Sequence, residues 1–365
     1  MTLRRILLVS GAIVVAVLVV VALLLRHYTS SRYVVRSLEE KLGPDYRVAI
    51  ESSHYDLFSQ TFYASGVAVV EDTLSHGPKP DGGRRRSWSS YELPAVAVRG
   101  VNLWELKRGS IIADEFRFER PVVKVFLDRK TPSKHPGPRR MPHEVLMASD
   151  SRVRIGTVKI VRGDIEYGEQ SLTGVRPGTF RFADFYLTMH NFGNDRARMR
   201  SPCVIDVRTR LANSGLMNAT FNYDLSSEVT KLNYHAVMGK MDETGLNSLL
   251  MNIKGIRIEE GTIDSLRADI SVHGDNATGT VWIPYHKLKF TVLDKATHKQ
   301  DMNDKFATFM SARTTRDSNP EDDGDPVTMV HVQRRRAPNV SLMKFVWETV
   351  RQGALMAVGA PERPN

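Results

Sequence analysis

Cysteine is almost absent from this sequence, because Cys203 is the single thiol among 365 residues. One thiol can form neither an internal disulfide nor a four-cysteine zinc site, so both are excluded. Cys203 lies in a segment where apolar and polar residues alternate, which favours a small buried core residue. A cysteine nucleophile is the alternative, but no histidine pattern accompanies it.

Recognisable catalytic and metal-binding motifs are also missing. The 11 histidines form no His-x-x-x-His or His-Glu-x-x-His pattern, and the acidic run over 321–325 lacks the closing glutamate of an EF-hand loop. There is no Gly-x-Ser-x-Gly elbow, no Walker loop and no Gly-x-Gly-x-x-Gly turn. We therefore predict no catalytic residues, no metal site and no cofactor, and we do not expect an enzyme.

Acidic residues are in deficit, with 41 Asp and Glu against 51 Lys and Arg, which gives a net charge of +10. A basic surplus of this size indicates an anionic partner, either nucleic acid or a membrane surface. Hydrophobic residues make up 41% of the chain, and this share excludes a disordered protein.

Charge is absent from an apolar run near the N-terminus, over residues 6–25. At about 1.5 Å per residue, a helix of that length spans a hydrocarbon core of about 30 Å. The run ends without a small-residue cleavage site, so we predict an uncleaved transmembrane anchor, with a cleaved signal peptide as the alternative. The positive-inside rule does not settle its orientation. We expect a cytoplasmic tail over 1–5 and the rest of the chain across the membrane, which removes nucleic acid as a partner and leaves lipid headgroups.

Helical periodicity is scarce beyond this run, and alternation with a period of two dominates. Segments such as 203–211 and 266–273 show one apolar and one polar face, and the whole pattern gives about 15 strands. The fold class is therefore mainly β, with few short helices. We divide the chain into an N-terminal β part over 33–130, a loop or linker over 131–150 and a C-terminal β part over 151–333. A C-terminal amphipathic helix follows over 341–358, with Ser341 as its N-cap.

A few short helices cannot cover the apolar faces of so many strands. Three architectures remain: two stacked sheets, a closed barrel, or a long curved sheet whose apolar face is filled by something else. Stacked sheets are the commonest of the three, whereas a neighbouring membrane anchor favours a curved sheet filled with lipid. The pattern alone leaves the choice open.

Several fragments, in order along most of the chain, resemble the AsmA-like family of envelope proteins, whose large members are related to bridge-like lipid transfer proteins. The opening strands at 46–52 and 62–70 are similar, and so is a hydrophobic-Leu-hydrophobic-basic-Gly turn at 101–109. A hairpin made of a strand, Arg-Pro and a second strand follows at 111–127, and a strand with a Gly-Asp-hydrophobic-polar-Tyr element follows at 152–167. The C-terminal third is the most specific part, with similar segments at 249–261, 279–294, 345–347 and 353. This chain is shorter than the large members, and its surface loops look like insertions.

The resemblance implies an elongated, curved antiparallel β-sheet with a hydrophobic groove, carried by a single-pass anchor in the inner membrane with its main body in the periplasm. It implies phospholipid acyl chains and the membrane as partners, together with envelope proteins or further copies of the chain. The implied function is phospholipid transport or outer-membrane and envelope maintenance. A membrane-anchored scaffold for outer-membrane protein assembly, with a packed and lipid-free β core, is the alternative.

Two sets of residues would carry this function. Acyl chains would lie on apolar strand faces, because burial is worth about 25 cal/mol per Å² and needs no specific geometry. The predicted lipid-binding groove consists of Ile205, Val207, Phe221, Tyr223, Leu266, Ala268, Ile270, Val272, Leu288, Phe290 and Val292. A wide apolar helix face beside basic residues suits a membrane surface, so the predicted membrane contacts are Arg334, Arg335, Arg336, Leu342, Phe345, Val346 and Trp347. A helix packed on the end of the sheet, beside a solvated basic loop, is the alternative.

Overall fold

The computed structural model of the chain describes most of the region after the predicted anchor. The described residues are 35, 39, 46–56, 58–71, 87–101, 105, 108–131, 137–172, 174, 176–196, 199, 201–212, 214–241, 243–294, 297, 316–322 and 324–359. The anchor predicted over 6–25 and the tail over 1–5 lie outside them. Within the described part, no helix combines the length and the apolarity that a membrane span requires.

The described part of the chain is mainly β, as predicted, and holds sixteen strands. The N-terminal strands are β1 (Tyr46–Ala49), β2 (Ser52–Asp56), β3 (Thr61–Glu71), β4 (Ser87–Arg99), β5 (Ile111–Glu119), β6 (Val122–Asp128), β7 (Val153–Gln170) and β8 (Gly178–Gly193). The C-terminal strands are β9 (Cys203–Leu211), β10 (Gly215–Tyr223), β11 (Lys231–Met238), β12 (Ile256–Ile263), β13 (Leu266–His273), β14 (Asn276–Trp282), β15 (Tyr285–Val292) and β16 (Met329–Arg335). Alternating side chains therefore predicted the elements well.

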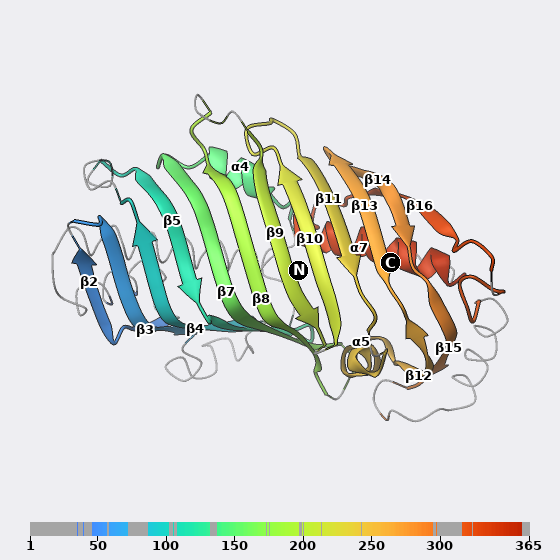
Figure 1. Cartoon of the computed structure of the whole chain (residues 1–365). Coiled ribbons are helices and arrows are strands. Elements are labelled where there is room, and N and C mark those ends of the chain that lie inside the picture. The colour runs from blue at the N-terminus through green and yellow to red at the C-terminus, as the bar shows by residue number, and fades with distance from the viewer. Residues whose placement is uncertain are drawn as a thin grey trace.

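Fourteen of these strands form one curved sheet (Figure 1). Its order is β1-β3-β4-β5-β7-β8-β9-β10-β11-β13-β14-β16, with β2 beside β3 and with β6 between β4 and β7. The strands β12 and β15 pair separately as a small second sheet. The N-terminal and C-terminal β parts that the sequence suggested are thus joined by continuous strand pairing.

The segment predicted as a strand, Arg-Pro, strand hairpin is not a hairpin. Strands β5 and β6 lie end to end, and both pair antiparallel with β4 and parallel with β7. Between them, Arg120 has a left-handed φ of 51° and Pro121 lacks an N–H, so the strand is interrupted without reversing. The sheet is consequently mixed, because β7 pairs parallel with β5 and β6, whereas an antiparallel sheet was predicted.

That interruption is one of five bends that lie side by side in neighbouring strands, and we call this row of bends the bend line. Gly66 in β3 has a φ of 57°, and Arg162 in β7 and Asp184 in β8 have φ values of 55° and 48°. The strand register places Gly66 opposite Pro94 of β4 and aligns the Arg120 interruption with the other two sites. Left-handed residues turn an extended chain sharply, so the N-terminal half of the sheet folds along this line.

Folding along the bend line creates the first hydrophobic core. One arm contains β2, β5 and the 61–65, 95–99 and 153–161 segments, and the other contains β1, β6 and the 67–71, 87–93 and 164–170 segments. Both arms supply buried side chains to a single cluster, including Phe62, Phe116 and Val158 from one and Val69, Val125 and Tyr167 from the other. The N-terminal half therefore covers its apolar face with its own sheet.

The C-terminal half covers its apolar face with helices. Helix α7 (Leu342–Ala357) lies across the sheet near β11, β13, β14 and β16, and α4 (Pro142–Met147) lies on the same side (Figure 1). We call this side the inner face. Helix α7 occupies the position predicted for the amphipathic helix over 341–358, and Ser341 is its N-cap residue, although the Ser341 side chain makes no capping hydrogen bond.

The segment over 131–150, predicted as a loop or linker, is the crossover that joins β6 to the parallel strand β7. It contains α4, with Pro142 at the start of the helix. Met141 belongs to the second core, and Leu146 packs against both cores. Helix α4 and the preceding Met141 therefore pack where the two halves of the sheet meet.

Candidate functional site

The inner face is apolar because the strand register aligns the apolar positions of successive strands. Ile205 of β9 lies opposite Phe221 of β10, which lies opposite Tyr234 of β11 and then Ile270 of β13. A second row runs in parallel two residues away on each strand, through Val207, Ala219, Ala236 and Ala268. Alternation within each strand predicted these faces, and pairing assembles them into one surface.

The predicted groove residues divide by exposure. Tyr223, Ala268, Ile270 and Val272 are buried in the second core. Ile205, Val207, Phe221 and Leu266 are half-buried on the main sheet. Leu288, Phe290 and Val292 are half-buried on β15, which belongs to the separate two-stranded sheet. The structure thus brings most of the set to one face, while β15 pairs only with β12 among the described strands.

Helix α7 explains why part of the predicted groove is buried. Phe345 is fully buried against the sheet, and the Tyr234 hydroxyl donates a hydrogen bond to the Val346 carbonyl at 3.3 Å. A Cβ on Gly353 would lie 2.4 Å from Val281 Cγ2, so only glycine allows the helix to approach β14 this closely. Protein atoms, rather than a ligand, therefore fill the inner face from β11 to β16.

A half-buried apolar surface remains between the two cores, and we call it the central stripe. It consists of Leu187 and Met189 on β8, Ile205 and Val207 on β9, and Phe221 on β10. Leu187 pairs with Val207 and Met189 pairs with Ile205 across the β8–β9 ladder. Sequence reasoning missed Leu187 and Met189 as site residues, although their alternation in the 180–189 segment was a signal for a strand.

The residues predicted to touch a membrane are mostly engaged within the protein. Leu342, Phe345 and Val346 are buried in the second core, so their side chains are not at the surface. The geometry therefore matches the alternative of a helix packed on the sheet for these three, while Trp347 is 54% exposed on the outward side of α7.

The basic run before α7 divides in the same way. Arg334 forms an ion pair with Glu348 of α7 at 3.2 Å, and Arg336 pairs with Asp275 at 2.7 Å. Arg336 also donates hydrogen bonds to backbone carbonyls, including that of Val340 at 2.9 Å. Only Arg335 of the three is exposed, so Arg334 and Arg336 have structural partners and Arg335 is the one that reaches solvent.

Helix α4 covers one end of the inner face through a buried aromatic pair. His143 Nδ1 lies 2.7 Å from the Tyr223 hydroxyl, and the two rings meet edge to face. Burial lowers the pKa of His143 and raises the pKa of Tyr223. Burial is the largest influence on the pKa of His143, so this position favours a neutral imidazole.

Cys203 lies close to this pair on the same face. It is buried in the second core, and burial raises the pKa of its thiol to about 12. A thiol is a poor nucleophile unless it is ionised, so the surroundings of Cys203 suit the core role inferred from alternation.

No protein-family model and no curated protein matches the chain, so the site is interpreted from its geometry.

Proposed function

We propose that the chain binds phospholipid acyl chains on the central stripe, and that it acts as a membrane-anchored periplasmic protein in phospholipid transport or envelope maintenance. In this proposal the curved sheet is an elongated groove. The observation that carries it is that the five side chains of the central stripe are apolar and only half-buried. Met189 packs against both cores, and Ile205 and Phe221 pack against the second core, so the stripe joins the two cores and still keeps accessible apolar surface. The order of fragments that resembles the AsmA-like family supports the same function.

Acyl chains suit this surface for physical reasons. Apolar burial is worth about 25 cal/mol per Å² and has no directional requirement, so flexible chains can lie across flat strand faces. The stripe offers aliphatic and aromatic side chains without a charged group among its five members.

A scaffold with a lipid-free core is the second candidate, and one observation favours it. Helix α7 and the folded N-terminal arms already fill most of the inner face with protein side chains. If the remaining stripe is covered by a protein partner, no lipid needs to bind. The two candidates differ in what touches Phe221.

The test is site-specific photocrosslinking on the full chain expressed in its membrane. A benzophenone amino acid replaces Phe221 on the inner face or, as the matched control, Asn218 on the exposed opposite face of the same strand. We expect phospholipid adducts by mass spectrometry at position 221 and none at position 218. Protein adducts without lipid adducts at position 221 would support the scaffold, and equal lipid labelling at both positions would reject a specific groove.

A further inference from the structure

The outer face of the C-terminal half carries a row of uncharged polar side chains. Strand register places Asn222 of β10, Asn233 of β11, Ser271 of β13, Thr278 of β14 and Gln333 of β16 opposite one another in sequence across the sheet. All five side chains are exposed, on the face opposite the central stripe. We call them the amide–hydroxyl row. Five strands about 4.8 Å apart make a row about 19 Å long.

These side chains keep their hydrogen-bonding capacity for solvent or a ligand. Among the described residues, none of the five bonds to another protein group through its side chain. The next row on the same face behaves differently, because Thr220 donates to Asp206 at 2.7 Å and His235 lies 2.5 Å from Asp269. The amide–hydroxyl row therefore has donors and acceptors that are not used by cross-strand pairing.

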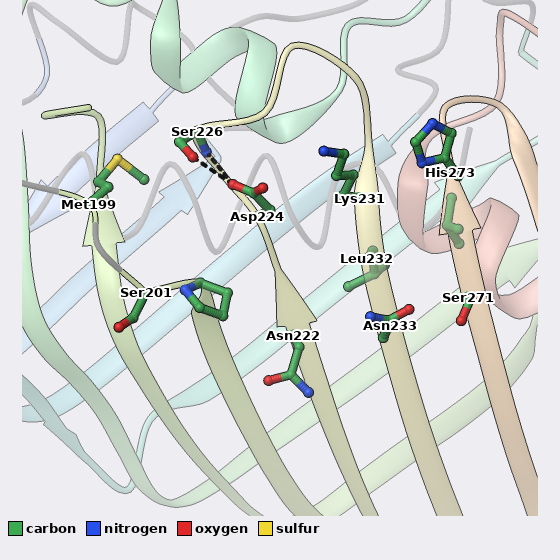
Figure 2. Close-up of a pocket in the computed structure, with 12 residues that line it drawn as sticks. Met199, Ser201, Asn222, Asp224, Ser226, Lys231, Leu232, Asn233, Ser271 and His273 are labelled. Carbon is green, nitrogen blue, oxygen red and sulfur yellow. Dashed lines mark hydrogen bonds between the residues drawn. The ribbon is translucent and has the colours of Figure 1, made fainter. Parts of the chain in front are cut away.

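A shallow depression of about 550 Å³ lies at the β10 end of this row (Figure 2). Asn222, Asn233 and Ser271 line it, as the close-up shows, and Asp224, Lys231 and His273 border it on the next row. Hydrogen bonds from the Ser226 hydroxyl at 2.7 Å and the Ser226 N–H at 3.1 Å hold one Asp224 oxygen. They also lower the pKa of Asp224, so its carboxylate is a fixed acceptor beside the neutral amides.

We propose that the amide–hydroxyl row and this depression bind an extended, uncharged oligosaccharide. Sugar hydroxyls both donate and accept hydrogen bonds, and asparagine and glutamine amides match them with one donor and one acceptor group each. The strand spacing is close to the length of one sugar residue, so a straight chain of sugars meets one side chain per strand. The row itself is neutral, with charges of both signs beside it, which matches a neutral ligand better than an anionic one.

The test uses the full chain in detergent with three soluble probes: cellohexaose, chitohexaose and maltohexaose. Saturation-transfer NMR and titration calorimetry measure binding. We expect a straight β-linked hexasaccharide to bind more tightly than the coiled α-linked maltohexaose. Asn222→Ala and Asn233→Ala should each weaken binding about threefold to tenfold, as expected for one lost hydrogen bond. Asn218→Ala is the matched control, because Asn218 is exposed on the same face of β10, two rows away.

Three results would overturn the proposal. One is the absence of binding by all three probes at millimolar concentration. Another is equal affinity in the Asn233→Ala and Asn218→Ala variants. The third is a change in the sedimentation coefficient that Asn233→Ala causes and Asn218→Ala does not. Such a change would mean that the row contacts a second copy of the protein. Because this row and the central stripe lie on opposite faces, a failure here leaves the lipid proposal untouched.

Discussion

The two halves of the sheet cover their apolar faces in different ways. The N-terminal half buries its apolar face by bending at Gly66, Arg120 and Arg162, so that one arm of the sheet packs on the other. The C-terminal half stays extended and accepts α7 as a separate layer. The comparison shows that an apolar strand face must be packed against a second layer. Residues at a few bends, or one helix distant in sequence, decide whether that layer is the sheet itself or a helix. The central stripe lies where the two cores meet, and its side chains are only half covered there.

The outer faces of the two halves differ as well. On the N-terminal half, Glu115 of β5 pairs with Lys159 of β7 at 2.7 Å and with Arg99 of β4 at 3.7 Å, so charges are matched across the strands. On the C-terminal half, Asp269 of β13 pairs with Arg267 at 2.8 Å and lies 2.5 Å from His235 of β11, whereas the neighbouring amide–hydroxyl row has no such pairing. Exposed ion pairs contribute little to stability, so this difference concerns what each surface can bind.

The comparison predicts that removing the anchor of α7 damages one half of the sheet. Phe345→Ala should lower the free energy of unfolding by about 3–5 kcal/mol, because it leaves a cavity under the helix. Hydrogen exchange should accelerate in β13, β14 and β16, while β3 to β7 keep their protection. Trp347→Ala, on the exposed side of the same helix, should change stability by less than about 1 kcal/mol. Equal acceleration in both halves would mean that the two cores are not separate.

The buried ion pair of α7 should matter more than its exposed counterparts. Glu348 is buried and meets Arg334 at 3.2 Å and Lys344 at 3.3 Å, so Glu348→Gln leaves cations without a partner charge. We expect a loss of about 2 kcal/mol in urea denaturation. Glu260→Gln breaks the exposed pair with Lys289 and should cost less than about 1 kcal/mol. Similar losses in the two variants would contradict the role given to burial.

A substitution on the bend line tests how the N-terminal half folds over. Gly66→Val places a branched side chain at a φ of 57°, and we expect a loss of about 1.5 kcal/mol measured by urea denaturation. Gly137→Val is the control, because Gly137 is exposed and has nothing near its added Cβ. If both variants were equally stable, the left-handed conformation of Gly66 would not be what limits the bend.

The smallest predicted effect is a pH dependence at the junction of the halves. Burial lowers the pKa of His143, while the charges of Glu144 and Asp224 and a hydrogen bond with the Glu228 backbone act in the opposite direction. The unfolded chain, with an ordinary histidine pKa near 6.5, then binds the proton more readily than the folded chain. Stability is therefore complete above about pH 6.5 and decreases as the pH falls through the lowered pKa. Thermal melts of the wild type and His143→Gln between about pH 7 and 5 should diverge, and parallel curves would contradict the assignment.

Sequence reasoning predicted the strands of this protein better than their pairing. Alternation at Ile205 and Phe221 depends only on neighbouring residues, so the strands and their apolar faces were visible without a structure. Arg-Pro at 120–121 looked like a hairpin turn because a short-range pattern does not show whether the chain reverses or continues. The structure shows that it continues, with β4 and β7 as partners on either side.

The candidate site divides in the same way. The sequence by itself determined a mainly β chain, its inner and outer faces, the buried thiol of Cys203 and a C-terminal apolar helix, because periodicity, composition and burial tendency are local properties. Only the tertiary structure decided that Phe345 and Ile270 belong to one core, that Ile205 and Phe221 stay half-buried, and that Asn222 and Asn233 share a row. Each of these depends on contacts between segments far apart in the chain, and such contacts are set by bends, register and packing together.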